Sequence, residues 1–136
     1  MVETDRGVEI DFRRRLEQHP LYFPCHKVSA LRIDNTIQIQ YDSSANVFTG
    51  ITSFSGTSFD FNLHGSVLDV LHFFVESGFR KKGHGRKFYQ IIEDFARDYG
   101  CVRAVTFPSG EGREFWPKMG FNRYYAGGMA EKCLIS

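Results

Sequence analysis

The spacing of apolar residues changes along the chain and predicts a helix followed by a run of short strands. Apolar positions three to four residues apart predict a helix that begins after a capping residue, Thr4 or Asp5, and ends near residue 18. Two prolines then predict a loop over residues 19–30. Four stretches with turn residues between them predict an antiparallel meander, with strands at residues 30–33, 36–41, 47–54 and 58–63.

The second half of the chain contains the strongest strand signal, residues 67–75, which are largely apolar on both faces as in the middle of a sheet. A glycine-rich turn and an amphipathic helix over residues 88–99 come next. The pattern then predicts a strand at 101–107, a short helix at 110–119 and a hairpin of residues 121–125 and 129–135. This order predicts an α/β or α+β protein with one mixed sheet, in a single domain that spans residues 1–136.

Composition narrows the class of protein without naming a substrate. The chain has 136 residues and a net charge of only +1, so we expect neither a nucleic-acid partner nor a membrane partner. Its three cysteines are widely spaced, which argues against a disulfide framework and favours a cytoplasmic location. Because no stretch resembles a signal peptide or a transmembrane helix, we expect neither. Cys25 and His26 lack further ligands at zinc-like spacing, so we expect no metal, and we expect a monomer or a homodimer.

Positive charge is concentrated in the glycine-rich turn between the strong strand and the amphipathic helix. Residues 80–87 hold five of the seventeen Lys and Arg residues and no acid. The remaining twelve bases face sixteen acids, so the rest of the chain has a net charge of −4. A turn of this kind directs several backbone N–H groups to one point at the positive end of a helix, where a phosphate group can bind. We therefore expect a phosphate-bearing ligand here.

Two kinds of phosphate-binding turn fit this position, and the residues after Gly83 distinguish them. Gly78 and Gly83 have the spacing of a P-loop, but His84 and Gly85 stand where a P-loop has Lys and Ser or Thr. The lysine that binds the γ-phosphate and the hydroxyl that binds Mg²⁺ are therefore both missing, which leaves a P-loop-like phosphate binder as a remote alternative. The other candidate is the pattern R-x-x-G-x-G, present as Arg80, Gly83 and Gly85.

This turn and its surroundings resemble the GNAT superfamily of acyl-CoA N-acyltransferases. Residues 74–85 resemble the acyl-CoA pyrophosphate loop of that family, and residues 115–121 resemble its later F-Y-x-K-L-G-F signature. The resemblance covers roughly residues 65–136, the acyl-CoA core, and leaves residues 1–64 as the acceptor-side region. It implies a mostly antiparallel mixed sheet flanked by helices, in which the strands at 67–75 and 101–107 splay apart to admit the cofactor.

The resemblance also implies which residues bind the acyl-CoA cosubstrate, with acetyl-CoA as the default donor. Backbone groups at the end of the strong strand should pair with pantetheine, and an N–H assigned to Val75 should stabilise the developing oxyanion. Glycines 83 and 85 should let the backbone approach the phosphates. The expected cofactor-binding residues are Phe73, Phe74, Val75, Arg80, Lys81, Lys82, Gly83, His84, Gly85, Arg86, Ser109 and Trp116.

The acceptor amine must lose a proton during transfer, and Asp69 is the first candidate for the base. Asp69 lies eleven residues before Arg80, where histone-acetylating members of the family carry a glutamate, and an apolar strand should raise its pKa. His72 is a weaker alternative, expected on the opposite face of the strand because side chains alternate. A water held by the protein is a further alternative.

The chain departs from the family where the thiolate leaving group takes up its proton. Trp116 stands where the family often has a tyrosine acid, and Ser109 where it often has an asparagine. Tyr124, Tyr125 or a water could supply the proton, or the thiolate could leave without full protonation. The sequence thus predicts an acyl-CoA-dependent N-acetyltransferase that acts by direct attack of a primary amine, on a small molecule or a protein. A weakly active or inactive CoA-binding or interaction module with the same fold is the alternative.

Overall fold

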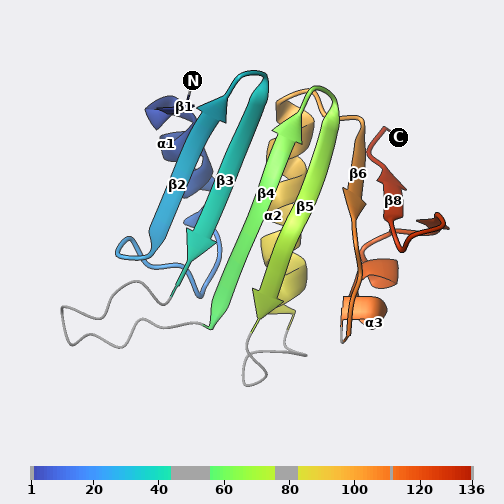
Figure 1. Ribbon diagram of the computed structural model, residues 1–136. Coiled ribbons are helices and arrows are strands. Elements are labelled where there is room, and N and C mark those ends of the chain that lie inside the picture. The colour runs from blue at the N-terminus through green and yellow to red at the C-terminus, as the bar shows by residue number, and fades with distance from the viewer. Residues whose placement is uncertain (1, 44–55, 76–82, 111, 136) are drawn as a thin grey trace.

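The computed structural model describes residues 2–43, 56–75, 83–110 and 112–135. Within these ranges, one eight-stranded sheet has the order β1-β2-β3-β4-β5-β6-β8-β7 (Figure 1). The strands are β1 Val2–Thr4, β2 Lys27–Ile33, β3 Thr36–Asp42, β4 Thr57–His64, β5 Val67–Val75, β6 Arg103–Thr106, β7 Arg123–Tyr124 and β8 Ala130–Cys133. The helices are α1 Arg6–Leu16, α2 His84–Asp98 and α3 Gly112–Lys118.

The sheet is mixed and mostly antiparallel, which confirms the predicted fold class. Every pair of neighbouring strands runs antiparallel except β5 and β6, which run parallel and are joined through α2. The expected strand at residues 47–54 lies outside the described residues. The loop expected at 19–30 ends sooner than predicted, because β2 begins at Lys27 and pairs with β3 up to Asp42.

The first two helices begin in different ways, α1 at a side-chain cap and α2 at a glycine without one. The carboxylate of Asp5, one of the two expected caps, caps α1 by accepting a hydrogen bond of 3.1 Å from the Val8 N–H. That bond and the neighbouring Arg32 lower the pKa of Asp5. Helix α2 begins at His84, earlier than predicted, directly after Gly83, which has a left-handed φ of 81°.

The core lies between one face of the sheet and helices α1 and α2, which Figure 1 shows on the same side of the strands. Phe12 of α1 packs edge-on against Phe95 of α2, with ring centroids 5.1 Å apart, and against Phe61 of β4 at 5.5 Å. Phe59, also fully buried, stacks near Phe73 of β5 at 5.8 Å. We call this side the helix-covered face.

Side chains on the other side of β3, β4 and β5 are mostly polar. They alternate with the buried core residues along each strand, and cross-strand pairing lines them up in rows. We call this side the polar face; its members include Gln38, Gln40, Asp60, Asn62, Asp69 and His72.

Candidate functional site

An irregularity in β5 shapes the site at the centre of the sheet. Along the pair of β4 and β5, Phe61 lies opposite Val70 and Asp60 lies opposite His72, so the register shifts by one residue between them. Leu71 is the extra residue on β5, and its side chain is 53% exposed. This is a β-bulge, a feature that redirects side chains and is common beside active sites.

The bulge corrects one expectation drawn from simple alternation. Asp69 lies opposite Asn62 and His72 lies opposite Asp60, and these two partners are two residues apart on β4. Directly opposed residues share a face of an antiparallel pair, so Asp69 and His72 both lie on the polar face. The prediction that they point to opposite faces is wrong, because Leu71 uses up one step of the alternation.

Asp69 occupies a position suited to a base. Its side chain is half-buried, and burial raises the pKa of its carboxyl above the ordinary value of 3.8. Its cross-strand neighbour Asn62 contributes a buried amide oxygen to the same region. His72 is exposed, and its Nε2 lies 3.0 Å from the hydroxyl of Ser58. The two predicted titratable groups are thus brought to one face, at different depths.

Strands β5 and β6 pair over only part of their length. The parallel register runs from Val67 opposite Arg103 to Val70 opposite Thr106, where the Thr106 hydroxyl donates a hydrogen bond of 3.1 Å to the Val70 carbonyl. Strand β6 ends at Thr106, whereas β5 continues along β4 to Val75. Figure 1 shows the two strands diverging toward their C-terminal ends. This is the splayed pair that the resemblance implied.

The three residues expected to pair with pantetheine lie on this overrunning part of β5. Phe73 is half-buried and stacks on Phe115 of α3 with ring centroids 5.3 Å apart. Phe74 is 44% exposed on the polar face, and Val75 is buried on the helix-covered face. The backbone of residues 73–75 thus belongs to the part of β5 that has diverged from β6. Its contact with a cofactor stays a prediction.

The glycine turn leads directly into α2. Gly83 has a φ of 81°, and a Cβ at Gly85 would lie 3.3 Å from Cε1 of Phe115 and 3.6 Å from Cγ2 of Val75. Gly83 is thus favoured by its backbone conformation and Gly85 by close packing against the end of β5 and α3. His84 is half-buried, Arg86 is exposed, and the expected residues Arg80, Lys81 and Lys82 lie outside the described residues.

Two buried side-chain atoms bear on whether the site on β5 and at the start of α2 fits acyl-CoA. Among the described residues, Oδ1 of Asn62 and Nδ1 of His84 are buried without a hydrogen-bond partner. Asn62 lies opposite the candidate base, and His84 lies between the two glycines of the turn. Buried polar atoms normally have partners. A ligand that brings polar groups to both ends of the site, as an acylated coenzyme does, fits these positions.

Trp116 belongs to the core. It is 5% exposed, and its indole packs edge-on against Tyr89 of α2 at 5.5 Å and Phe121 at 5.1 Å. A buried indole in this cluster favours a packing role, and its expected contact with the cofactor stays a prediction. Ser109 is exposed, and its carbonyl accepts a hydrogen bond of 3.0 Å from the Gly112 N–H at the start of α3.

The signature at residues 115–121 has a structural explanation that the sequence did not provide. Gly120 has a φ of 99°, and a Cβ there would lie 2.9 Å from Cε of Lys132. The Lys132 ammonium donates a hydrogen bond of 2.7 Å to the Met119 carbonyl and lies 2.5 Å from the carboxylate of Glu93, which is 2% exposed. Glycine therefore leaves room for a buried ion pair that joins α2 to β8. An acid among the apolar residues of α2 was the available signal.

Other chemical groups sit apart from β5. Tyr124 and Tyr125 are both exposed, and the Tyr125 hydroxyl donates a hydrogen bond of 2.9 Å to Glu131. In the described parts of the chain, no cluster of three or more metal-ligating side chains is present. No helix in these ranges is long and apolar enough to cross a membrane.

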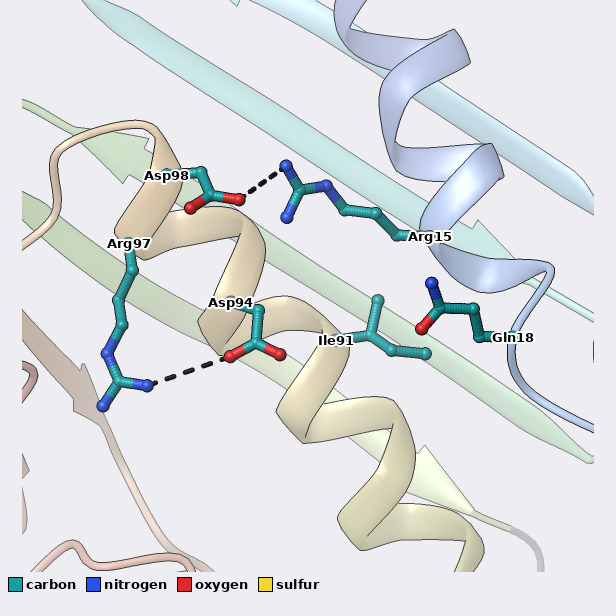
Figure 2. A pocket seen from close by; sticks show the side chains of 6 residues that line it. All are labelled: Arg15, Gln18, Ile91, Asp94, Arg97 and Asp98. Carbon is teal, nitrogen blue, oxygen red and sulfur yellow. Dashed lines mark ion pairs between the residues drawn. The ribbon is translucent and has the colours of Figure 1, made fainter.

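A depression of about 360 Å³ lies between α1 and α2, on the helix side of the sheet (Figure 2). Its charged residues already pair with each other or with neighbours, for example Arg15 with Asp98 at 2.8 Å and Arg97 with Glu93 at 2.9 Å. It lies on the helix-covered side, opposite the polar face that carries Asp69. We therefore assign the candidate site to the diverging strands and not to this depression.

The sheet is mixed, its central strand β5 is bulged, β5 and β6 diverge, and a glycine precedes α2. Together these features define a protein with the fold of the acyl-CoA N-acyltransferases, the class that the sequence of the turn indicated. A family model described as the acetyltransferase (GNAT) family matches residues 19–121. The chain belongs to this family. Comparison with curated protein sequences gives no significant match.

Solved structures agree with the fold at low sequence identity. The PaiA N-acetyltransferase of Thermoplasma acidophilum, solved with coenzyme A, is 12% identical with a TM-score of 0.55 over 73% of this chain and 61% of its own. Tetrahymena GCN5 is 12% identical with a TM-score of 0.55 over 96% of this chain and 86% of its own. A GNAT-family acetyltransferase of Staphylococcus aureus is 11% identical with a TM-score of 0.54 over 99% and 100%.

Proposed function

We propose that this chain transfers an acetyl group from acetyl-CoA to a primary amine by direct attack. One observation carries the proposal: Asp69 lies on the polar face of β5, one residue before Val70, where the pairing of β5 with β6 ends. Base and cofactor cleft are thereby adjacent on one strand. The family supports the reaction type, since its members are acetyltransferases.

Acyl-CoA would bind along the end of β5 and over the start of α2. Backbone groups of residues 73–75 would pair with pantetheine, and the backbone N–H of Val75 would stabilise negative charge on the thioester carbonyl oxygen. The N–H groups around Gly83 and Gly85 would face the pyrophosphate, helped by the positive end of the helix. Bound acetyl-CoA supplies an activated acyl carbon with a thiolate leaving group.

Asp69 would take the proton of the acceptor, directly or through a water. A lysine-like amine has a pKa of about 10.4 and attacks only when it is unprotonated. Burial raises the pKa of the Asp69 carboxyl, which makes it a better proton acceptor than an exposed aspartate. The amine nitrogen then bonds to the carbonyl carbon, the carbon–sulfur bond breaks, and sulfur leaves with the electron pair. Water then returns a proton to sulfur, since the tyrosines of the β7–β8 hairpin lie apart from β5.

The second candidate function is a CoA-binding module without turnover. Trp116 motivates it, because the indole is buried in the aromatic cluster and has no acidic proton to offer to the thiolate. A thiolate whose thiol has a pKa of about 8.5 can leave without being protonated by an acid. The buried indole therefore argues against protonation of the thiolate by a residue at position 116, and less against acyl transfer itself.

The deciding experiment measures free thiol released from acetyl-CoA with a panel of primary amines, together with direct acetyl-CoA binding. We expect turnover with at least one amine, and we expect Asp69→Asn to lower kcat/KM by about 10²-fold or more while acetyl-CoA binding stays within about twofold. His72→Gln is the matched control on the same face, expected to lower kcat/KM by less than about fivefold.

The outcomes separate the two functions. Tight acetyl-CoA binding without turnover on any amine would favour the module. Absence of acetyl-CoA binding would overturn both and leave the phosphate-binding turn without an acyl-CoA ligand. If His72→Gln abolishes turnover and Asp69→Asn does not, the base has been assigned to the wrong residue of the polar face.

A further inference from the structure

A buried histidine from the first half of the chain reaches the glycine turn of the second half. His19 lies in the segment between α1 and β2 and is 3% exposed. Its Nε2 lies 3.0 Å from the carbonyl oxygen of His84, across 65 residues of sequence. Its Nδ1 accepts a hydrogen bond of 3.0 Å from the Leu21 N–H. Both ring nitrogens are thus engaged with backbone.

These two contacts fix the protonation state of the ring. Because the Leu21 N–H donates to Nδ1, that nitrogen carries no proton, and the proton of the neutral ring sits on Nε2. Nε2–H therefore donates to the His84 carbonyl. The ring is also stacked on Phe88 of α2, with centroids 3.6 Å apart and an angle of 14° between the planes. His19 is held against the first turn of α2 by both polar and apolar contacts.

Holding the His84 carbonyl also orients the next N–H group. The peptide that joins His84 to Gly85 is planar, so its C=O and its N–H point in opposite directions. A hydrogen bond that fixes the carbonyl on the His19 side therefore fixes the Gly85 N–H on the other side. The first N–H groups of a helix have no intrahelical partner and are the ones that bind a phosphate.

We propose that His19 is a positioning residue for acyl-CoA: it orients the peptide between the two glycines of the turn so that its N–H faces the pyrophosphate. This rests on the proposed function, and it gives the acceptor-side half of the chain a role in donor binding. His19 touches the turn and not the reacting atoms, so it sets the affinity for the coenzyme rather than the rate of the chemical step.

Charge on His19 works against this arrangement. Burial lowers the pKa of His19 below its ordinary value of 6.5. Electrostatic interaction with His84 and Lys87 on α2 lowers it further, against the opposing effect of the bond to the His84 carbonyl. A second proton would have to go to Nδ1 and would break the Leu21 bond. The protonated ring keeps the bond to the His84 carbonyl but loses the Leu21 contact that holds it in place. The contribution of His19 is therefore complete above pH 6.5 and weakens as the pH falls through its lowered pKa.

The test compares three variants of the full chain by calorimetric binding of CoA and by hydrogen exchange. His19→Phe keeps a flat ring over Phe88 but loses both hydrogen bonds. His19→Gln places an amide donor near the position of Nε2. His26→Phe is the matched control: His26 is also buried in the same segment and also accepts from a backbone N–H, that of Phe23, but it bonds Tyr41 of β3 and not α2.

We expect His19→Phe to weaken CoA binding about five- to tenfold, as the loss of one oriented hydrogen bond would. His19→Gln should recover to within about threefold of the wild type, and His26→Phe should lower thermal stability without changing CoA affinity. At saturating acetyl-CoA, kcat of His19→Phe should stay within about twofold. Without ligand, the amides of residues 84–87 should exchange faster in His19→Phe than in His26→Phe.

Equal CoA affinity of His19→Phe and the wild type overturns the proposal, and so does an equal loss in His19→Phe and His26→Phe. These results leave the proposed function standing, because the wild type still binds CoA. If the wild type itself does not bind CoA, the proposed function and the role of His19 both fail.

The pH dependence of the affinity for the coenzyme distinguishes a positioning role of His19 from a purely structural one. The probe is 3′-dephospho-CoA, because a phosphate monoester itself titrates near pH 6. Between pH 7.5 and 5.0 the wild type should lose several-fold more affinity than His19→Gln, which cannot titrate; His84 is present in both, so its effect cancels. Identical pH dependence in the two proteins contradicts the proposal.

Discussion

The two faces of the central strands differ in what their side chains do, although they alternate along the same backbone. Phe59 on β4 is fully buried against aromatic rings of both helices, while its neighbour Asp60 is half-buried on the polar face opposite His72. The helix-covered face excludes water and stabilises the fold. The polar face holds the groups that can exchange protons. Successive residues of one strand therefore serve different purposes: one stabilises the core and the next is available for chemistry on the other face.

The bulge at Leu71 connects the two faces. Before the bulge, Leu68 and Val70 face the core and Asp69 faces the polar side; after it, Phe73 and Val75 face the core again. Without the extra residue, either Asp69 or the end of β5 would be on the wrong side. A single inserted residue lets one strand fill the core along its whole length and still present the base.

The largest expected effect contrasts Phe59 with Asp60. Phe59→Ala removes a fully buried ring that packs against Phe12 and Phe88, so we expect the free energy of unfolding to fall by about 3–5 kcal/mol. Asp60→Asn on the polar face should change it by less than about 0.5 kcal/mol. Urea denaturation followed by circular dichroism measures both. Comparable losses in the two variants would mean that the faces do not differ as described.

The next effect concerns the ion pair beneath Gly120. Lys132→Met leaves Glu93 buried with Arg97 at 2.9 Å as an ionic partner and with hydrogen bonds from Tyr89 and Gln90. We therefore expect a loss of about 2 kcal/mol, less than for a wholly unpaired buried charge. Adding Glu93→Gln removes the buried charge and should recover part of that loss. Thermal or urea unfolding of the single and double variants measures the coupling. Strictly additive losses would show that the two side chains do not interact.

A smaller effect separates charge from shape in the glycine turn. Gly83→Asp and Gly83→Asn have nearly the same shape and share the strain of a φ of 81°, which Asn and Asp tolerate better than most residues. Only aspartate places a negative charge where phosphates are expected. We expect aspartate to weaken CoA binding about tenfold more than asparagine, by calorimetry, with equal thermal stability. Equal CoA affinities of the two variants would show that the phosphates of CoA do not bind at this turn.

The smallest effect is a change of stability with pH at Asp69. Burial raises the pKa of Asp69 above 3.8, so the folded state holds its proton more tightly than the unfolded state does. Stability is then lost as the pH rises from 3.8 through the raised pKa. Asp69→Asn should therefore melt at the same or a slightly higher temperature than the wild type at pH 7, and the difference should shrink toward pH 4. A lower melting temperature at pH 7 would show that the carboxylate stabilises the fold.

Much of the architecture was accessible from local pattern. The helical spacing of Val8, Phe12 and Leu16 predicted α1, and Asp5 was among its predicted caps. Strand β5 was predicted with its bounds, because nine apolar-rich residues between turn signals leave little choice. The glycine turn was accessible because glycine and positive charge coincide before a helix. These signals depend on neighbours in sequence, which a sequence displays directly.

The errors and omissions involve partners distant in sequence. The three-residue β1 pairs with β2 and has too few residues to show a pattern of its own. His19 was part of a predicted loop, and its contact with the turn depends on a residue 65 positions away. The exchange of faces at His72 depends on the register of β4, which alternation within β5 cannot show.

The sequence by itself determined the order of elements, the mixed sheet, the family resemblance and the identity of Asp69 as the first candidate base, because periodicity and motif spacing are local properties of the chain. The tertiary structure decided that Asp69 and His72 share a face, that Trp116 packs in the core, and that His19 holds the turn. Those facts follow from register and from packing between segments distant in sequence, which are settled only when the whole core is assembled.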